Sequence, residues 1–220
     1  MKRRDFSTTV VTSMVGIGLG WSSLAQAQAG KLQADRDYRA LEKAAPTDSP
    51  AGKIEVVEFF GYYCGHCNAF EPTLEAWTKT LAKDISFKRV PVAFQDNAVP
   101  YQRLYYSLEA MGLVASMQPK VFAAIHQQRK TLSDATSIAE WIAEQGVDRA
   151  KFMDQYNSFS VATKCTKAKQ LQNAYQIEGV PTLGVAGRYW TDGNLTGSNT
   201  RALQVVDSLV AEIRAKRLPG

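Results

Sequence analysis

The 220-residue sequence predicts an α/β fold with an inserted all-helical domain. Residues 54–90 have the hydrophobic spacing of a strand, a helix and a second strand. From Pro100 to about Tyr175 the spacing is helical, with no convincing strand. Strand spacing then returns at residues 182–190, and one more helix follows. Because the long helical run interrupts the strands, we expect a helical domain inserted into an α/β domain.

Residues 1–27 are organised like an export signal peptide. Lys2-Arg3-Arg4 is a basic start, residues 10–21 are apolar, and Ala25-Gln26-Ala27 fits the small-x-small cleavage rule. Cleavage after Ala29 is the alternative. A membrane anchor is the other reading, but the apolar run is short for a span and is interrupted by Gly and Thr.

Two export routes fit this start of the chain. Arg3-Arg4-Asp5-Phe6 resembles a twin-arginine signal, while paired basic residues also occur in ordinary secretion signals. Either route ends outside the cytoplasm, where disulfides form and persist. Of the formal net charge of +5, residues 2–5 contribute two charges. The remaining charge of about +3 is too small and too scattered to indicate nucleic-acid binding.

The first part of the α/β domain is predicted over residues 28–98. Residues 38–41 form a short first strand, and Ile54–Phe60 form a strand covered on both faces. A helix from about Cys64 to Lys83 follows, with Pro72 inside it, where a kink is expected. Ile85–Val90, closed by Pro91, form a third strand parallel to the second. The apolar face of the predicted helix comprises Phe70, Leu74, Trp77 and Leu81.

The helical insertion is predicted over residues 99–162. Ser137 to Glu140 read as a capping box, Gly146 as a helix stop, and Asp148 as the cap of the next helix. A longer helix over 161–175 leads out of the insertion. The remaining apolar stripes are Leu104, Leu108 and Met111, and Val121, Phe122 and Ile125.

The second part of the α/β domain is predicted over residues 163–220. Pro181 enters a strand at Thr182–Val185, and a tight turn at residues 186–188 leads to Tyr189-Trp190. Thr200 is the expected cap of a final helix.

Cys64 and Cys67 form a C-x-x-C pair at the start of the first long helix. The unpaired N–H groups of a helix start favour a thiolate at Cys64, and packing should cover Cys67. Such a pair is a dithiol/disulfide switch, so we predict a thiol–disulfide exchange enzyme. A structural bridge or half a zinc site is the alternative. Beyond His66, only His126 and Cys165 could complete that zinc site outside the acids.

The order β-α-β, helical block, β-β-α is that of a thioredoxin fold with a helical insertion. The sequence also contains four informative features, namely Glu58-Phe59-Phe60, Cys64-Gly65-His66-Cys67, Pro72 and Gly179-Val180-Pro181. Together they resemble the DsbA family of periplasmic disulfide oxidoreductases. The resemblance covers essentially the whole mature chain. Gly65 departs from it, because the best-known members have Pro there, which leaves the oxidising strength open.

Two polar residues are predicted to assist the cysteines. His66 can donate to the Cys64 sulfur, the alternative being an idle surface histidine. Glu58 lies on a strand that otherwise reads as core, so its pKa should rise, and it could relay the proton of Cys67. An exposed Glu on an edge strand is the other reading.

The resemblance also implies a substrate-binding segment. It places Pro181, in the cis form, opposite the two cysteines, where the backbone at Val180 would pair with an extended substrate chain. A trans-Pro at the strand entry is the alternative. Tyr62 and Tyr63 are expected to line an apolar groove. Cys165 is expected to be a core thiol, the alternative being a partner for mixed disulfides or dimerisation, and His126 is expected to be a solvated surface residue.

The predicted function is a periplasmic dithiol oxidase that donates the Cys64–Cys67 disulfide to unfolded or newly exported cysteine-containing proteins. The resemblance implies reoxidation by a membrane quinone-linked partner resembling DsbB. We expect no cofactor other than the redox-active disulfide, no metal and no nucleic acid, and a monomer. One alternative is an isomerase or reductase of the same fold kept in the dithiol form. The other is a peptide-binding, chaperone-like module with incidental thiols.

Overall fold

A computed structural model describes residues 32–220, and the predicted signal peptide lies outside the described residues. Five strands of the described chain form one sheet in the order β1-β5-β4-β2-β3. The strands are β1 (Arg39–Ala40), β2 (Ile54–Phe60), β3 (Ile85–Pro91), β4 (Thr182–Val185) and β5 (Tyr189–Asp192).

The strand that precedes the C-x-x-C pair lies inside the sheet. β2 is parallel to β3 and antiparallel to β4. All of its residues except Ile54 are buried, as the uninterrupted apolar run predicts. The sequence predictions of 54–60 and 182–185 are confirmed to the residue, and the antiparallel β4–β5 hairpin is confirmed.

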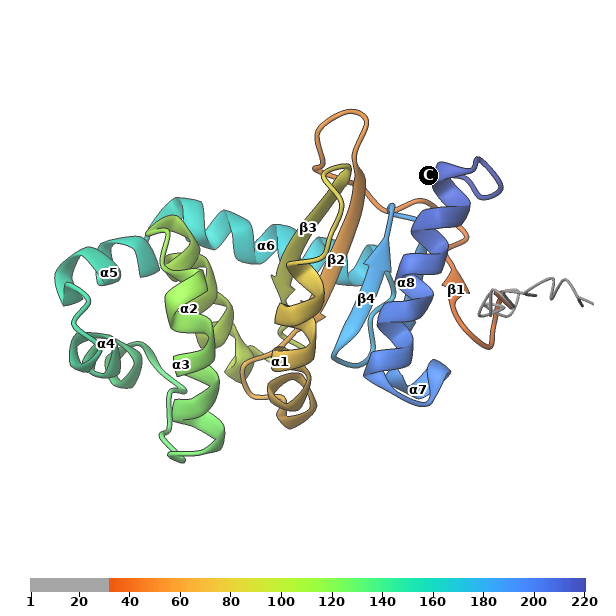
Figure 1. Cartoon of the computed structure of the whole chain (residues 1–220). Coiled ribbons are helices and arrows are strands. Elements are labelled where there is room, and N and C mark those ends of the chain that lie inside the picture. Colours follow the sequence, from red (N-terminus) through yellow and green to blue (C-terminus); the bar gives the residue numbers. More distant parts are fainter. Residues whose placement is uncertain (1–31) are drawn as a thin grey trace, which may run out of the picture. The chain divides into compact units, whose positions relative to one another are not determined.

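Helices cover both faces of the sheet. Val56 and Leu183 share one core with residues of α1 (Gly65–Thr78) and α8 (Asn199–Arg214). On the other face, the ring of Phe59 packs against that of Tyr175, which follows α6 (Phe159–Ala174), at a centroid distance of 5.1 Å. Figure 1 shows α1 and α8 on one side of the sheet and α6 on the other. This arrangement is the predicted thioredoxin fold.

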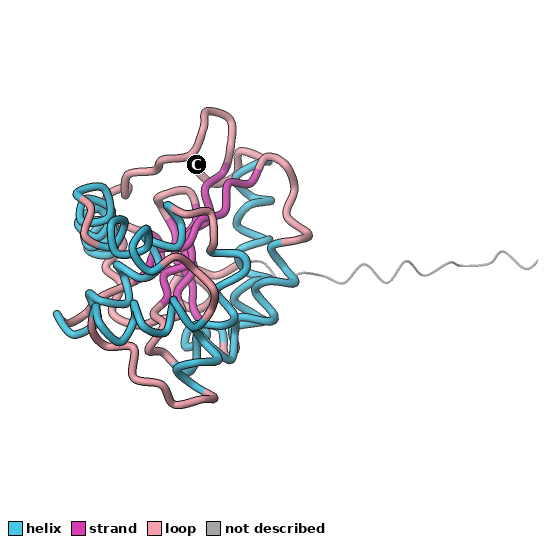
Figure 2. The backbone as a smooth tube through the Cα atoms, turned by 90° about the vertical axis from the view of Figure 1, so that its left-hand side faces the viewer, coloured by secondary structure: helices cyan, strands magenta, loops and turns pink. Residues whose placement is uncertain are grey.

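The predicted helical run between β3 and β4 is confirmed. Viewed from the helical side, these helices lie in front of the sheet (Figure 2). α6 spans the predicted boundary at residue 162 and leads back to the sheet. Among residues 32–220, no helix is both apolar and long enough to cross a membrane. The run comprises the short η1 (Asp96–Ala98), α2 (Val99–Ala110), α3 (Val114–His126), α4 (Ala135–Glu144), α5 (Arg149–Tyr156) and α6.

Two predicted helix caps are wrong. Asp134, not Ser137, caps α4, because its carboxylate accepts hydrogen bonds from the backbone N–H groups of Thr136 and Ser137. Ser198, not Thr200, caps α8 by accepting from the N–H of Arg201.

The other helix ends agree in part with the sequence predictions. Asp148 caps α5 as predicted, and Gly146 adopts a φ of +80° after α4, which a glycine tolerates at a helix end. α1 ends at Thr78, earlier than the predicted Lys83. A short helix, α7 (Gly193–Thr196), was not predicted.

Candidate active site

Cys64 is the N-cap of α1. Its sulfur accepts a hydrogen bond from the backbone N–H of Cys67 at 3.2 Å, and the side chain is half-buried. Cys64, Cys67 and Cys165 are all free thiols in this structure. The strand–turn–helix order of β2 and α1 therefore presents Cys64 at a helix start, as predicted.

The surroundings of Cys64 favour its thiolate. They lower its pKa from 9.0 to about 6, most of all through a hydrogen bond from the Cys67 thiol. The backbone N–H groups of Cys67 and His66 and the charge of His66 act in the same direction, while burial opposes them. At neutral pH the sulfur of Cys64 is therefore mostly ionised.

Cys67 has the opposite character. It is 1% exposed, and burial raises its pKa far above that of an ordinary thiol. The hydrogen bond that it donates to Cys64 also favours the protonated form. The pair thus combines an accessible, acidic thiol with a shielded thiol that holds its proton.

His66 is exposed at the start of α1. Within residues 32–220, no hydrogen bond joins its imidazole to the Cys64 sulfur, and the donation that was predicted comes from the backbone N–H of His66. His66 instead acts through its backbone N–H and its charge. Its side chain lines a cavity of about 310 Å³ whose other walls are Gly179, Val180, Pro181, Asp192, Gly193, Asn194, Gly197, Ser198 and Asn199.

The segment before β4 lies against Cys64. The Val180–Pro181 peptide bond is cis, as predicted. When Cys64 is protonated, its thiol donates a hydrogen bond to the Val180 carbonyl at 3.3 Å, although the two residues are 116 positions apart. The fold therefore brings together Cys64, Val180 and Pro181.

Glu58 is buried on β2, with 1% of its surface exposed. Burial raises its pKa to about 7, against the opposing effect of the Arg89 guanidinium. Arg89 Nε donates to Glu58 Oε2 at 2.9 Å from the registered position on β3. The predicted rise of the Glu58 pKa is confirmed, and the charge of Glu58 in turn raises the pKa of Cys67.

Arg89 and two acids of α1 were not predicted as site residues. Arg89 Nη2 donates to Glu71 at 2.8 Å and to Glu75 at 3.0 Å. The buried side chain of Arg89 therefore pairs with three carboxylates at once. One sequence signal pointed to Glu71, because it follows Cys67 by four positions and shares its helix face.

The two tyrosines before Cys64 differ in position. Tyr63 is half-buried, and its hydroxyl donates to the Val92 carbonyl at 3.3 Å. Tyr62 is fully buried, so the prediction that it lines a groove is wrong. It packs instead into the core, where its ring contacts those of Phe60 on β2 and Phe122 on α3. Tyr63 does line a cavity, of about 430 Å³, with Phe94, Gln95, Asn97, Ala98, Tyr101 and Ser133.

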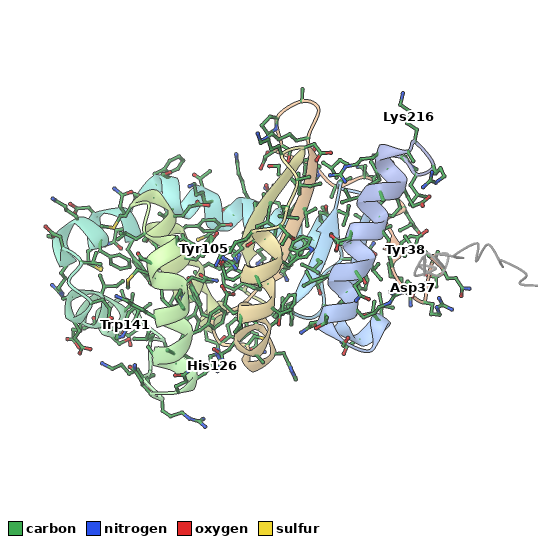
Figure 3. The ribbon with its side chains drawn as sticks, in the orientation of Figure 1. Asp37, Tyr38, Tyr105, His126, Trp141 and Lys216 are labelled. Carbon is green, nitrogen blue, oxygen red and sulfur yellow. The ribbon has the colours of Figure 1, made fainter. Side chains whose placement is uncertain are left out.

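His126 and Cys165 are both partly buried and contact other parts of the fold. His126 is not a solvated residue, since it is partly buried and its Nε2 donates to the Tyr62 carbonyl at 2.8 Å. Figure 3 shows it at the end of α3, on the side of α1. Cys165 packs against the core, and burial raises its pKa to about 11, which agrees with a core thiol. Within residues 32–220, no group of three or more His, Cys, Asp or Glu could hold a metal ion.

Comparisons with known proteins agree with this geometry. The family model described as DSBA-like thioredoxin domain matches residues 74–201. The thiol:disulfide interchange protein DsbA of Bordetella pertussis is 44% identical over 209 residues, covering 94% of this chain and 99% of that protein. The corresponding protein of Burkholderia cepacia is 42% identical over 207 residues, covering 94% and 97%. The crystal structure of Pseudomonas aeruginosa DsbA superimposes with a TM-score of 0.81 at 39% identity, covering 84% of this chain and 96% of that one. The chain therefore belongs to the family of DsbA-like thioredoxin domains.

Proposed function

We propose that this protein is a periplasmic dithiol oxidase, which donates a Cys64–Cys67 disulfide to exported proteins that carry reduced cysteines. The contrast between the two thiols supports this most directly, since the Cys64 pKa is about 6 and the Cys67 pKa is raised. A thiolate stabilised at Cys64 favours the dithiol form of the enzyme. The disulfide form is then the stronger oxidant.

The exchange runs in two steps. A substrate thiolate attacks Cys64 Sγ, the Cys64–Cys67 bond breaks, and Cys67 leaves as a thiolate. Cys67 then takes a proton from the Glu58 carboxyl, whose pKa of about 7 suits proton transfer near neutral pH. A second substrate thiolate attacks the substrate sulfur of the mixed disulfide. This releases oxidised substrate and Cys64 as a stabilised thiolate.

Substrate contacts follow from the same geometry. The backbone at Val180 and the cis Pro181 flank the Cys64 sulfur, which suits an extended chain bound beside it. Tyr63 contributes one wall of an adjacent cavity. His66 assists through its positive charge when protonated, which favours the thiolate.

The location and partners belong to the same proposal. The basic start, apolar run and small-x-small site of residues 1–27 direct the chain to export. Each round leaves the enzyme as a dithiol, so an oxidant must restore the disulfide. A membrane protein resembling DsbB, linked to quinone, is the reoxidant that we propose. The disulfide itself is the only redox group required.

Complementation tests the oxidase. Cys64→Ser in a bacterial strain without its own periplasmic dithiol oxidase should abolish disulfide formation in exported proteins. Cys165→Ser is the matched control, because it changes a cysteine outside the pair, and it should complement fully. Retained activity of Cys64→Ser would overturn the proposal in favour of a binding module.

Acid trapping followed by alkylation separates an oxidase from an isomerase. In periplasmic extract, the Cys64–Cys67 pair of an oxidase should be mostly disulfide-bonded. A pair found mostly as dithiol would assign the protein to the isomerase or reductase class, with which the Cys-Gly-His-Cys sequence is also compatible.

A further inference from the structure

Two side chains of α3 hold the residue that leads into the active site. His126 Nε2 donates a hydrogen bond to the Tyr62 carbonyl at 2.8 Å, and Gln118 Oε1 accepts one from the Tyr62 hydroxyl at 2.6 Å. Tyr62 is fully buried and lies two positions before Cys64. The helical block therefore contacts both the main chain and the side chain of this residue.

The contact made by His126 is the one that acts on the main chain. Among residues 32–220, no other group donates to the Tyr62 carbonyl, so without His126 a buried acceptor would lose its partner. The imidazole lies 6.0 Å from the ring of Phe122, which in turn lies 5.2 Å from the ring of Tyr62. Neutral imidazole and imidazolium can both donate through Nε2, so the contact does not depend on the charge of His126.

Tyr62 belongs to the turn that places Cys64. The backbone N–H of Cys64 donates to the Gly61 carbonyl at 3.0 Å, which closes a tight turn between β2 and α1. Tyr62 and Tyr63 are the two central residues of this turn, and its shape depends on the direction of the peptide group between them. A hydrogen bond to the Tyr62 carbonyl therefore fixes how the chain delivers Cys64 to the helix start.

The Cys64 sulfur lies between two groups that act on it in opposite directions. The Cys67 backbone N–H donates to the sulfur at 3.2 Å and favours the thiolate. The Val180 carbonyl, at 3.3 Å, can only accept a hydrogen bond, so it favours the protonated thiol. A small movement of the sulfur away from the helix start would therefore raise the Cys64 pKa towards that of an ordinary thiol.

We infer that His126 is a positioning residue for the redox reaction, which fixes the turn before Cys64 so that the sulfur faces the first N–H groups of α1. The inference rests on the proposed function, because it concerns the same cysteine. His126 acts through the Tyr62 main chain and makes no contact of its own with the sulfur within residues 32–220. The helical block thereby takes part in setting the oxidising strength of the cysteine pair.

A matched pair of substitutions in the natural mature protein tests the hydrogen bond. In His126→Gln the amide nitrogen reaches as far from the main chain as the imidazole Nε2, whereas in His126→Asn it is one methylene shorter. The ultraviolet absorbance of the thiolate gives the midpoint of Cys64 ionisation. His126→Gln should keep this midpoint, and His126→Asn should raise it by about 0.5 to 1 pH unit, because the sulfur loses part of its contact with the helix start.

The equilibrium with glutathione gives a second measurement. A thiolate at Cys64 stabilises the dithiol enzyme, so a higher Cys64 pKa makes the disulfide enzyme a weaker oxidant. In His126→Asn the equilibrium constant for oxidation of glutathione by the enzyme should fall about three- to fivefold at pH 7. It should not change in His126→Gln. The ionisable groups around Cys64, which are His66, Cys67 and Tyr63, are present in both variants.

Gln102→Leu separates positioning from stability. Gln102 is a buried glutamine of α2 whose Nε2 donates to the Pro91 carbonyl at 2.8 Å, so it also joins the helical block to the sheet. Its loss should lower the free energy of unfolding in urea without moving the Cys64 midpoint. An unchanged midpoint in His126→Asn would overturn the inference, and so would an equal shift in His126→Gln or Gln102→Leu. The oxidase proposal would remain, because it depends on complementation by Cys64→Ser.

Tyr62→Phe decides the question if His126→Asn does not fold. This change removes the hydroxyl that Gln118 holds and keeps the buried ring. The turn then has one of its two contacts with α3, so the Cys64 midpoint should rise by about 0.3 pH unit. A midpoint equal to that of the wild type would refute the role of α3 in placing the sulfur.

Discussion

The low pKa of Cys64 makes the stability of the dithiol protein depend on pH. The pKa is about 6 in the folded protein, against 9.0 for the ordinary thiol. A thiol with a lower pKa when folded binds fewer protons than in the unfolded chain. The dithiol form therefore gains stability as the pH rises from about 6 to 9, and loses it as the pH falls through 6. The disulfide form has no such thiol and no such gain.

The size of this effect follows from the two pKa values. Their difference corresponds to about 4 kcal/mol of unfolding free energy above pH 9, where the gain is complete. Between pH 5 and pH 8, linkage gives about 2.5 kcal/mol. Solvent screens the half-buried sulfur, so we expect about 1–2 kcal/mol over this range.

Urea unfolding at the two pH values measures the effect. The wild-type dithiol protein and Cys64→Ser are compared in the presence of a reductant. Both proteins retain every other titrating group, including Glu58. The double difference, which is the change in unfolding free energy between the two pH values in the wild type minus the same change in Cys64→Ser, therefore isolates Cys64. The ultraviolet absorbance of the thiolate gives the midpoint independently. A double difference near zero, or an absorbance midpoint near 9, would refute the explanation of the acidic thiol.

Three other changes probe the surroundings of the cysteines. Cys67→Ala should raise the pKa of Cys64 towards that of an ordinary thiol, because the hydrogen bond from the Cys67 thiol is the largest contribution that lowers this pKa. An unchanged titration of the thiolate absorbance would contradict this. Glu58→Gln should abolish the inflection near pH 7 in the rate at which Cys67 resolves a mixed disulfide, whereas a persisting inflection would exclude Glu58 as the proton acceptor. Arg89→Met should lower the free energy of unfolding by about 3–5 kcal/mol at pH 7, since Glu58 and Glu71 lose their buried cation; a loss below about 1 kcal/mol in urea unfolding would show that the acids are neutral there.

Much of the fold could be predicted from local patterns. Ile54–Phe60 and Thr182–Val185 were predicted to the residue, because buried strands are bounded by turn residues and carry an uninterrupted apolar run. Helix starts were harder. Asp134 and Ser137 can both cap a helix, and only the observed hydrogen bonds to backbone N–H groups decide between them.

The cysteine pair and the cis proline could also be predicted. The C-x-x-C motif lies directly before an apolar helical pattern, which places Cys64 at a helix start, and the cis form of Pro181 was predicted from the resemblance of Val180-Pro181 to the family. The burial of Tyr62 could not be read in the same way. Neighbouring tyrosines are chemically alike, and the helical block that covers one of them is far away in the sequence.

The acid cluster shows where prediction from a single sequence ends. A buried Glu58 on a central strand requires a compensating cation, but its partner depends on strand register. In the parallel pair of β2 and β3, Glu58 lies opposite Arg89, and both side chains then share one face of the sheet. Arg89 also shares a strand face with Phe87, and its Cζ lies 5.8 Å from the centroid of that ring. An arginine on this otherwise apolar face was therefore a signal that the sequence offered. No such signal marks Gln118, which accepts the hydroxyl of Tyr62 only when the helical block packs against the segment that follows β2.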